Sequence, residues 1–189
     1  MVTLNRSIVL VGLMGAGKTS VGRKLAAALG VQFCDSDDEV EIAASMTIPE
    51  IFQNFGQDEF RRLERAVISR LLSEGPMVLS TGGGAFVQPE VRDAIAGAGV
   101  SVWLSVDTDV LWARVADKPG RPLLEAQDPL GTLTALAKER NPIYQTADMT
   151  VRSDGLDSQE DVAKTIIRAL AARDDSGIAA PVFGRSVTL

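Results

Sequence analysis

The segment from residue 7 to residue 29 constrains the fold most, because a glycine-rich loop joins an apolar run to an amphipathic helix. Ser7–Val11 is apolar and rich in β-branched residues. Residues 12–19, GLMGAGKT, match the pattern G-x-x-x-x-G-K-[ST]. Apolar side chains then recur at four-residue spacing within Lys18–Leu29, and Gly30 follows as a stop signal. A strand, a glycine loop and a helix in this order are typical of a phosphate-binding site.

The rest of the chain continues to alternate between strand-like and helix-like segments. Further strands are predicted at 31–35, 77–80, 100–106 and 149–151, and further helices at 38–45, 48–55, 58–74, 89–96, 108–116, 133–140 and 159–172. Repeated alternation favours an α/β fold, specifically a three-layer α/β/α architecture with a five-stranded parallel sheet. Proline and glycine interrupt the pattern around 117–131, which we therefore expect to form a mobile lid.

Length and composition limit the domain count and exclude several classes of function. The chain has 189 residues, which favours one domain at 1–173 followed by a flexible tail at 174–189. Its net charge of −6 argues against nonspecific nucleic-acid or anionic-membrane binding. The sequence contains no histidine, which excludes a histidine base or metal ligand, and one cysteine, Cys34, which excludes an internal disulfide. The single cysteine favours a reducing compartment, and no apolar run is long enough to span a membrane, so we expect a cytoplasmic protein. We expect a monomer, since no apolar helical stripe lacks a core role.

The glycine loop supplies the chemistry that a phosphate needs. Glycines allow successive backbone N–H groups to point inward, and the start of the following helix adds its positive end. In this pattern Lys18 reaches the β- and γ-phosphates, and the hydroxyl of Thr19 binds Mg²⁺. The alternative is a chance glycine turn before a helix.

Two acidic residues follow the second predicted strand. In an extended segment, Asp35 and Asp37 would point the same way, so that one carboxylate serves Mg²⁺ or its water and the other accepts a hydrogen bond from a substrate hydroxyl. The alternative is that they form a helix N-cap and a first-turn acid. Proximity to a phosphate loop favours the functional interpretation.

Cations and glycines at other loops fit an anionic small molecule. Arg61 and Glu64 are i,i+3 neighbours on a helix, where the glutamate could fix the guanidinium, although a solvated charged face is the simpler interpretation. Residues 82–84 are all glycine, which suggests close backbone approach to a ligand or a plain loop. Arg121 lies in the expected lid, where closure could bring it to a transferring phosphate, or is a surface arginine. Arg140 either binds the substrate or caps a helix C-terminus.

Together the motifs resemble the shikimate kinase family of P-loop kinases. They are D-S-D at 35–37, E-F-R-R-L-E at 59–64, T-G-G-G at 81–84, R-P-L-L at 121–124 and E-R-N-P-I-Y at 139–144, and the resemblance runs from about residue 8 to residue 172. The resemblance implies a phosphotransferase of aromatic amino-acid biosynthesis. Such an enzyme moves the γ-phosphoryl of ATP to the 3-hydroxyl of shikimate and gives shikimate 3-phosphate and ADP. The resemblance also implies Mg²⁺ as cofactor and no macromolecular partner. Another small-molecule kinase of this fold, acting on gluconate or a nucleotide, is an alternative, and so is a regulatory module that binds nucleotide without turnover.

The resemblance also implies roles for individual residues. Asp37 would orient or deprotonate the nucleophile, with Lys18 and Arg121 as the other catalytic residues, and Glu64 would support Arg61. Shikimate would contact Asp37, Arg61, Gly82, Gly83, Gly84 and Arg140. ATP would contact Gly12, Gly15, Ala16, Gly17, Lys18, Thr19, Ser20, Arg114 and Arg121, with residues 153–155 near the adenine. Thr19 and Asp35 would serve Mg²⁺, the latter through water.

Overall fold

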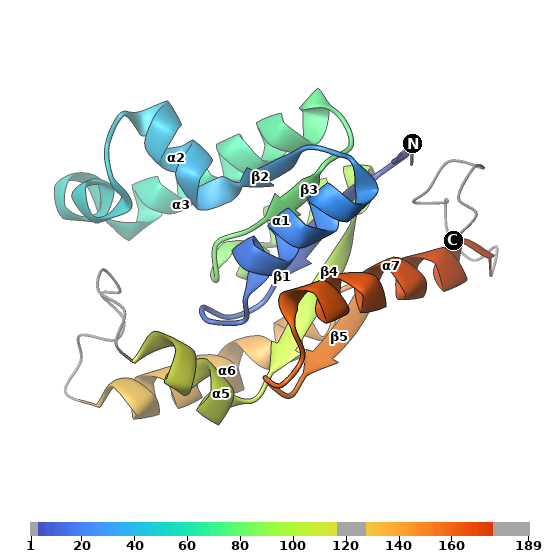
Figure 1. The fold of residues 1–189 in the computed structure, drawn as a ribbon. Helices are drawn as coiled ribbons and strands as arrows, with labels where there is room; N and C mark the ends of the chain where they lie inside the picture. The colour runs from blue at the N-terminus through green and yellow to red at the C-terminus, as the bar shows by residue number, and fades with distance from the viewer. Residues whose placement is uncertain (1–3, 117–127, 176–189) are drawn as a thin grey trace.

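A five-stranded parallel sheet forms the centre of the protein in the computed structural model, which describes residues 4–116 and 128–175. Its strands are β1 (Ser7–Val11), β2 (Phe33–Asp35), β3 (Val78–Ser80), β4 (Gly99–Val106) and β5 (Met149–Ser153). They lie in the order β2-β3-β1-β4-β5, and every neighbouring pair is parallel. All five carboxyl ends therefore meet at one edge, where the strands pass into the loops that carry the motifs (Figure 1).

Helices cover the sheet and extend beyond its edges. They are α1 (Lys18–Leu29), α2 (Ser36–Ala44), α3 (Ile48–Glu74), α4 (Pro89–Ala98), α5 (Thr108–Val115), α6 (Pro129–Tyr144) and α7 (Gln159–Asp175), with a short 3-10 helix, η1, at Ala85–Val87. α1 and α7 pack side by side on one face, while α4 packs against β4 and α3 (Figure 1). This architecture confirms the predicted three-layer α/β/α fold. None of the helices in the described part of the chain is long and apolar enough to cross a membrane.

The central strand, β1, is apolar throughout because helices cover both faces of the sheet. Every residue of β1 is buried, and Ile8, Val9, Leu10 and Val11 have no exposed surface. A strand between two parallel neighbours, with helices on both faces, has no polar side to present. The continuous apolar run that predicted β1 is therefore the direct signature of its position, and it fixes the glycine loop that follows at the middle of the sheet edge.

The beginning of α2 corrects one expectation about the acidic pair. The helix starts at Ser36, two residues before the predicted start, so Asp35 is its N-cap and Asp37 lies in its first turn. The extended geometry expected for Asp35 and Asp37 is therefore wrong. The capping interpretation is confirmed, and the two side chains leave the backbone in directions set by a helix start.

α3 contains the two helices that the sequence predicts separately. Gly56 has a non-helical backbone, with φ of 80° and ψ of −179°, and this kink divides Ile48–Glu74. A capping box starts the first part, since the side chain of Thr47 accepts from the N–H of Glu50 and that of Glu50 accepts from the N–H of Thr47. The bend lets the second part run along the cleft, where it carries Arg61 and Glu64.

α6 corrects the predicted boundary of the lid. The helix begins at Pro129, so residues 129–131 are helical and do not belong to an irregular excursion. It also continues past Arg140, through Pro142, to Tyr144. Residues 117–127, which include Arg121, lie outside the described residues, as does most of the segment predicted as a tail. The domain boundary at residue 173 stays a prediction.

Candidate active site

A large cleft, with a volume of about 1380 Å³, lies at the carboxyl ends of the strands. Most of the site residues predicted from the sequence line it. They are Gly15, Ala16, Gly17, Lys18, Thr19, Ser20, Asp35, Asp37, Arg61, Gly82, Gly83, Gly84, Arg114 and Arg140. Gly12 lies just beneath, where its carbonyl oxygen accepts a hydrogen bond from Lys18. The loops after β1, β2 and β3 thus converge, as expected for ligand sites of parallel sheets.

The loop after β1 has the backbone of a phosphate cradle. Gly12, Gly15 and Gly17 have positive φ values of 136°, 81° and 93°, which side chains with a Cβ rarely adopt. Gly17 is also the N-cap of α1, so the loop ends at the positive end of a helix. Nζ of Lys18 donates to the carbonyl oxygens of Gly12 at 2.7 Å and Leu13 at 2.9 Å. The buried lysine therefore lies over the loop, where it adds a full charge to the backbone donors.

Thr19, at the start of α1, and Asp35, at the end of β2, bring two oxygen-bearing side chains together. The hydroxyl of Thr19 donates to Oδ2 of Asp35 at 2.7 Å. Oγ of Ser80 lies 3.4 Å from Oγ1 of Thr19. Hydroxyl and carboxylate oxygens suit Mg²⁺, which keeps several waters and few protein ligands beside a phosphate. Within residues 4–116 and 128–175 no cluster of three or more acidic or thiol side chains could hold a metal alone. The pair therefore fits a magnesium ion that shares its coordination with a bound phosphate.

Asp37 is held in the cleft as a poorly solvated carboxylate. Its pKa is raised to about 7, mainly by burial and also by the charges of Asp35 and Glu64, while the charges of Lys18 and Arg61 oppose the shift. Its Oδ1 is fully buried and has no hydrogen-bond partner in the described part of the chain. A buried acceptor without a donor is costly, so the surroundings of this carboxylate disfavour its charged form.

The three glycines after β3 bring the charged groups together. A Cβ on Gly82 would lie 2.6 Å from Oδ1 of Asp37 and 2.7 Å from Oε1 of Glu64, and one on Gly84 would collide with the guanidinium of Arg61. The backbone N–H of Gly82 donates to Oγ of Ser36 at 3.1 Å, which ties the loop to the start of α2. The run of glycines is therefore a close approach of backbone to side chains, and the plain-loop alternative is wrong.

Arg61 is fixed from behind by Glu64. Nη1 of Arg61 lies 2.5 Å from Oε2 of Glu64, whose side chain is fully buried. Burial raises the pKa of Glu64, and the charge and hydrogen bond of Arg61 oppose that shift. Gln88 donates to the same oxygen at 2.7 Å. The solvated-face interpretation of this pair is wrong, since Glu64 is fully buried at the wall of the cleft and Arg61 also lines it.

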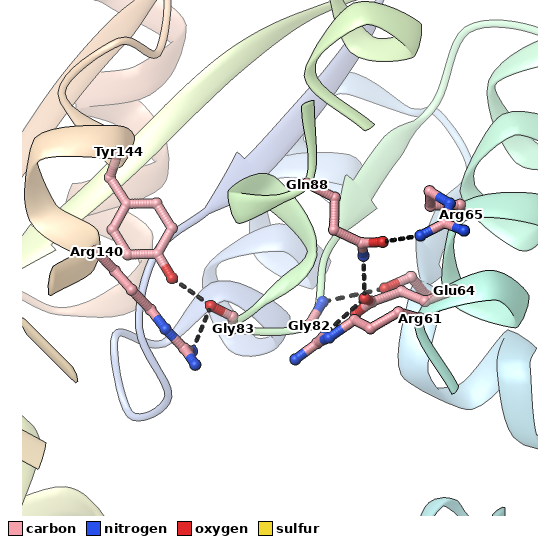
Figure 2. Close-up of polar contacts among 9 residues, drawn as sticks. Arg61, Glu64, Arg65, Gly82, Gly83, Gln88, Arg140 and Tyr144 are labelled. Carbon is pink, nitrogen blue, oxygen red and sulfur yellow. Dashed lines mark hydrogen bonds and ion pairs between the residues drawn. The ribbon is translucent and has the colours of Figure 1, made fainter. Parts of the chain in front are cut away.

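A second guanidinium reaches the glycine loop from the other side. Arg140 donates from Nη1 to the carbonyl oxygen of Gly83 at 3.2 Å, and the hydroxyl of Tyr144 donates to the same oxygen. Figure 2 shows Arg61 and Arg140 on either side of the loop, with their guanidinium groups toward the same open side. Because α6 continues for another turn, Arg140 does not cap its end. The two arginines thus face one space.

Tyr144, Ser36 and Gln88 support residues of the cleft through hydrogen bonds, and the sequence analysis gave them no role. Tyr144 is fully buried, its pKa is raised to about 12 by burial, and its ring stacks near Trp103. Tyr144 is the only tyrosine of the chain and the last residue of the motif E-R-N-P-I-Y, and this position could have identified it from the sequence. Ser36 stands between the two acids of D-S-D, whereas Gln88 stands directly before Pro89, a position typical of a helix cap.

The opposite end of the cleft is formed by α5 and the loop after β5. Nη1 of Arg114 donates to the carbonyl oxygen of Gly15 at 3.2 Å, which places this arginine beside the phosphate loop. Ser153 also lines the cleft, at the beginning of the segment 153–155 predicted near the adenine. Arg121, the remaining predicted residue, lies outside the described residues.

Comparison with known proteins identifies the family. The model of the family described as "Shikimate kinase" matches residues 14–171. The chain is 52% identical over 166 residues to a shikimate kinase of Mesorhizobium japonicum, covering 88% of this chain and 81% of the relative. It is 54% identical over 172 residues to one of Ruegeria pomeroyi, covering 91% and 88%.

Solved structures agree with the sequence relatives. The shikimate kinase of Acinetobacter baumannii in complex with shikimate superposes with a TM-score of 0.85 at 38% identity, covering 89% of this chain and 94% of that one. A gluconokinase of Sinorhizobium meliloti, at 22% identity and a TM-score of 0.60 over 92% and 95% of the two chains, shares the fold. With the family model, the relatives and the arrangement of the cleft in agreement, this chain belongs to the shikimate kinase family.

Proposed function

We propose that the protein transfers the γ-phosphoryl of ATP to the 3-hydroxyl of shikimate, giving shikimate 3-phosphate and ADP. The observation that carries this proposal is one cleft that is lined by a phosphate loop, the acidic side chain of Asp37 and two arginines. A triphosphate, a hydroxyl and a carboxylate are the three groups that such an arrangement accommodates. ATP offers the first, and shikimate offers the other two.

The phosphate side of the cleft neutralises charge and positions the nucleotide. The backbone N–H groups of residues 15–19 bind the phosphates, with Lys18 adding charge at the transferring group. Thr19 and Asp35 would hold Mg²⁺, which would supply positive charge beside the bound phosphates. Arg114 and the segment 153–155 border the adenosine, and Arg121 completes the charge around the transferring phosphoryl. Phosphoryl transfer depends mainly on such positioning and charge stabilisation.

The acceptor side of the cleft positions one hydroxyl for attack. The carboxylate of Asp37 accepts the hydrogen bond of the 3-hydroxyl and takes its proton as the oxygen attacks the γ-phosphorus. The new O–P bond forms as the bond from γ-phosphorus to the β,γ-bridging oxygen breaks, and ADP leaves with that electron pair. With a pKa near 7 in the free enzyme, Asp37 is a stronger proton acceptor than an ordinary aspartate.

Two arginines determine that the acceptor is an acid. Arg61, held by Glu64, and Arg140, held at Gly83, bind the carboxylate of shikimate, while Gly82, Gly83 and Gly84 allow the ring to approach the backbone. A guanidinium binds a carboxylate through parallel hydrogen bonds, which fixes orientation as well as charge. A neutral polyol would leave both cations without a counter-charge.

Replacing Arg61 with alanine is expected to raise the KM for shikimate about a hundredfold, because a charged hydrogen bond to the substrate contributes roughly 1.5–3 kcal/mol and Glu64 is left as an uncompensated buried charge. The KM for ATP should change little. Arg62→Ala is the matched control, since Arg62 is exposed on the same helix and pairs with Glu59. Steady-state kinetics with each substrate varied in turn measures both constants. Equal shikimate KM values in the two variants would contradict the placement of the carboxylate.

A further inference from the structure

Gln88 links Arg65 to Glu64, which in turn holds Arg61. The proposed chemistry gives Gln88 itself no role. Nε2 of its side-chain amide donates to Oε2 of Glu64 at 2.7 Å, and its Oε1 accepts from Nη1 of Arg65, also at 2.7 Å. Figure 2 shows the resulting chain of contacts, Arg65–Gln88–Glu64–Arg61, in which Gln88, at the end of η1, joins two residues of α3 and the last residue lines the cleft. The charges of the two neighbours fix the orientation of the Gln88 amide. In the flipped orientation, the amide oxygen would face the carboxylate of Glu64 and the amide NH₂ would face the guanidinium of Arg65.

Neither helix capping nor substrate contact accounts for this side chain. Gln88 is the N-cap residue of α4, but its side chain makes no capping hydrogen bond, and the backbone carbonyl alone accepts from the N–H groups of Val91 and Arg92. It is half-buried and is absent from the lining of the cleft, as is Arg65. Among the described residues, the side chain of Gln88 therefore makes its hydrogen bonds with Glu64 and Arg65.

Glu64 is the group that benefits from a second donor. Its side chain is fully buried, its Oε2 receives both Arg61 and Gln88, and its Oε1 has no partner among the described residues. One guanidinium on one oxygen leaves the carboxylate free to turn about its last side-chain bond, whereas two donors from different elements fix its plane.

We infer that Gln88 is a positioning residue for shikimate, which acts by holding Glu64 and through it the guanidinium of Arg61. The inference rests on the proposed function, in which Arg61 binds the shikimate carboxylate. It predicts that Gln88 affects shikimate binding and leaves ATP binding unchanged, because the chain of contacts ends at the acceptor side of the cleft.

The test uses two substitutions of nearly the same shape. Gln88→Met keeps the length of the side chain and removes both hydrogen bonds, and Gln88→Glu keeps the acceptor for Arg65 but sets a carboxylate oxygen against Glu64. We expect the KM for shikimate to rise about tenfold in Gln88→Met and at least as much in Gln88→Glu, with kcat within about twofold and the KM for ATP unchanged. Calorimetric titration with shikimate alone should show the same loss of affinity.

Gln53→Met is the matched control, since Gln53 is exposed on α3 and does not line the cleft. Melting temperatures of all variants show whether they are folded. The inference would be overturned, and the proposed function kept, if folded Gln88→Met and Gln88→Glu bind shikimate with wild-type affinity while Arg61→Ala loses much of its shikimate affinity. A parallel rise of both KM values would also overturn it, since that marks a general disturbance. An unchanged shikimate KM in Arg61→Ala would overturn the proposed function and, with it, this inference.

Discussion

Asp37→Asn is expected to lower kcat about a thousandfold, because the amide cannot take the proton of the attacking hydroxyl. General-base groups contribute roughly a hundredfold to ten-thousandfold. The asparagine keeps the size of the side chain and can still meet a hydroxyl, so the shikimate KM should change far less than kcat. Asp38→Asn is the matched control, since Asp38 is the next residue of α2, exposed and outside the cleft. Steady-state kinetics of the two variants measures the difference, and a kcat close to wild type in Asp37→Asn would refute the role.

The same substitution is expected to stabilise the ligand-free protein above pH 7. The pKa of Asp37 rises from 3.8 to about 7 on folding, because the carboxyl is buried and faces Asp35 and Glu64, with Lys18 and Arg61 only partly compensating. Between these two values the folded protein holds a proton that the unfolded chain has lost, so the contribution of Asp37 to stability falls as the pH rises and stays lost above pH 7. Asparagine removes this penalty.

Urea denaturation at pH 5 and pH 8 tests the stability effect. The rise of the Asp37 pKa from 3.8 to about 7 sets an upper limit of about 4 kcal/mol on the penalty, and solvent relaxation makes about 2 kcal/mol the expected gain for Asp37→Asn at pH 8. Near pH 5 the gain should be smaller, because the native carboxyl is then protonated and uncharged. An equal gain at both pH values would point to packing and away from ionisation.

Lys18→Met is expected to lower kcat by about a hundredfold to a thousandfold, the range found when one preorganised donor to a developing charge is removed. Methionine keeps the unbranched stem of the buried lysine but lacks the ammonium that lies over the carbonyl oxygens of Gly12 and Leu13. The KM for ATP should rise as well, since the same ammonium binds the phosphates. Lys138→Met, on the exposed face of α6, is the control. Kinetics with ATP varied measures both effects, and a kcat that matches the control would contradict the account.

The architecture could be predicted from sequence because its signals are local. The apolar run of β1 and the four-residue spacing in α1 each reflect a burial pattern that the fold confirms. Boundaries were less accurate where a polar residue has two functions. Asp35 both ends β2 and caps α2, so helix begins at Ser36, and the geometry expected for an extended pair did not occur.

The site could be predicted where a motif names its residues and could not where the contact is made across the fold. Lys18, Asp37, Arg61 and Arg140 all lie in one cleft, as the motifs indicated. Gln88 contacts Glu64 from 24 residues away in the sequence, and a polar residue before a proline is typical of an ordinary helix start. Only the packing of η1 against α3 shows what its side chain does.

The most direct test of the account is a coupled assay of ADP release by the purified protein with Mg-ATP and one acceptor at a time. The acceptors are shikimate, gluconate and AMP, with a reaction that contains no acceptor as the blank. The account predicts ADP release that depends on shikimate and yields shikimate 3-phosphate. ADP release with gluconate or AMP in place of shikimate would agree with the role of the phosphate loop but contradict the roles of Asp37, Arg61 and Arg140. ATP binding without release on any acceptor would contradict catalysis itself.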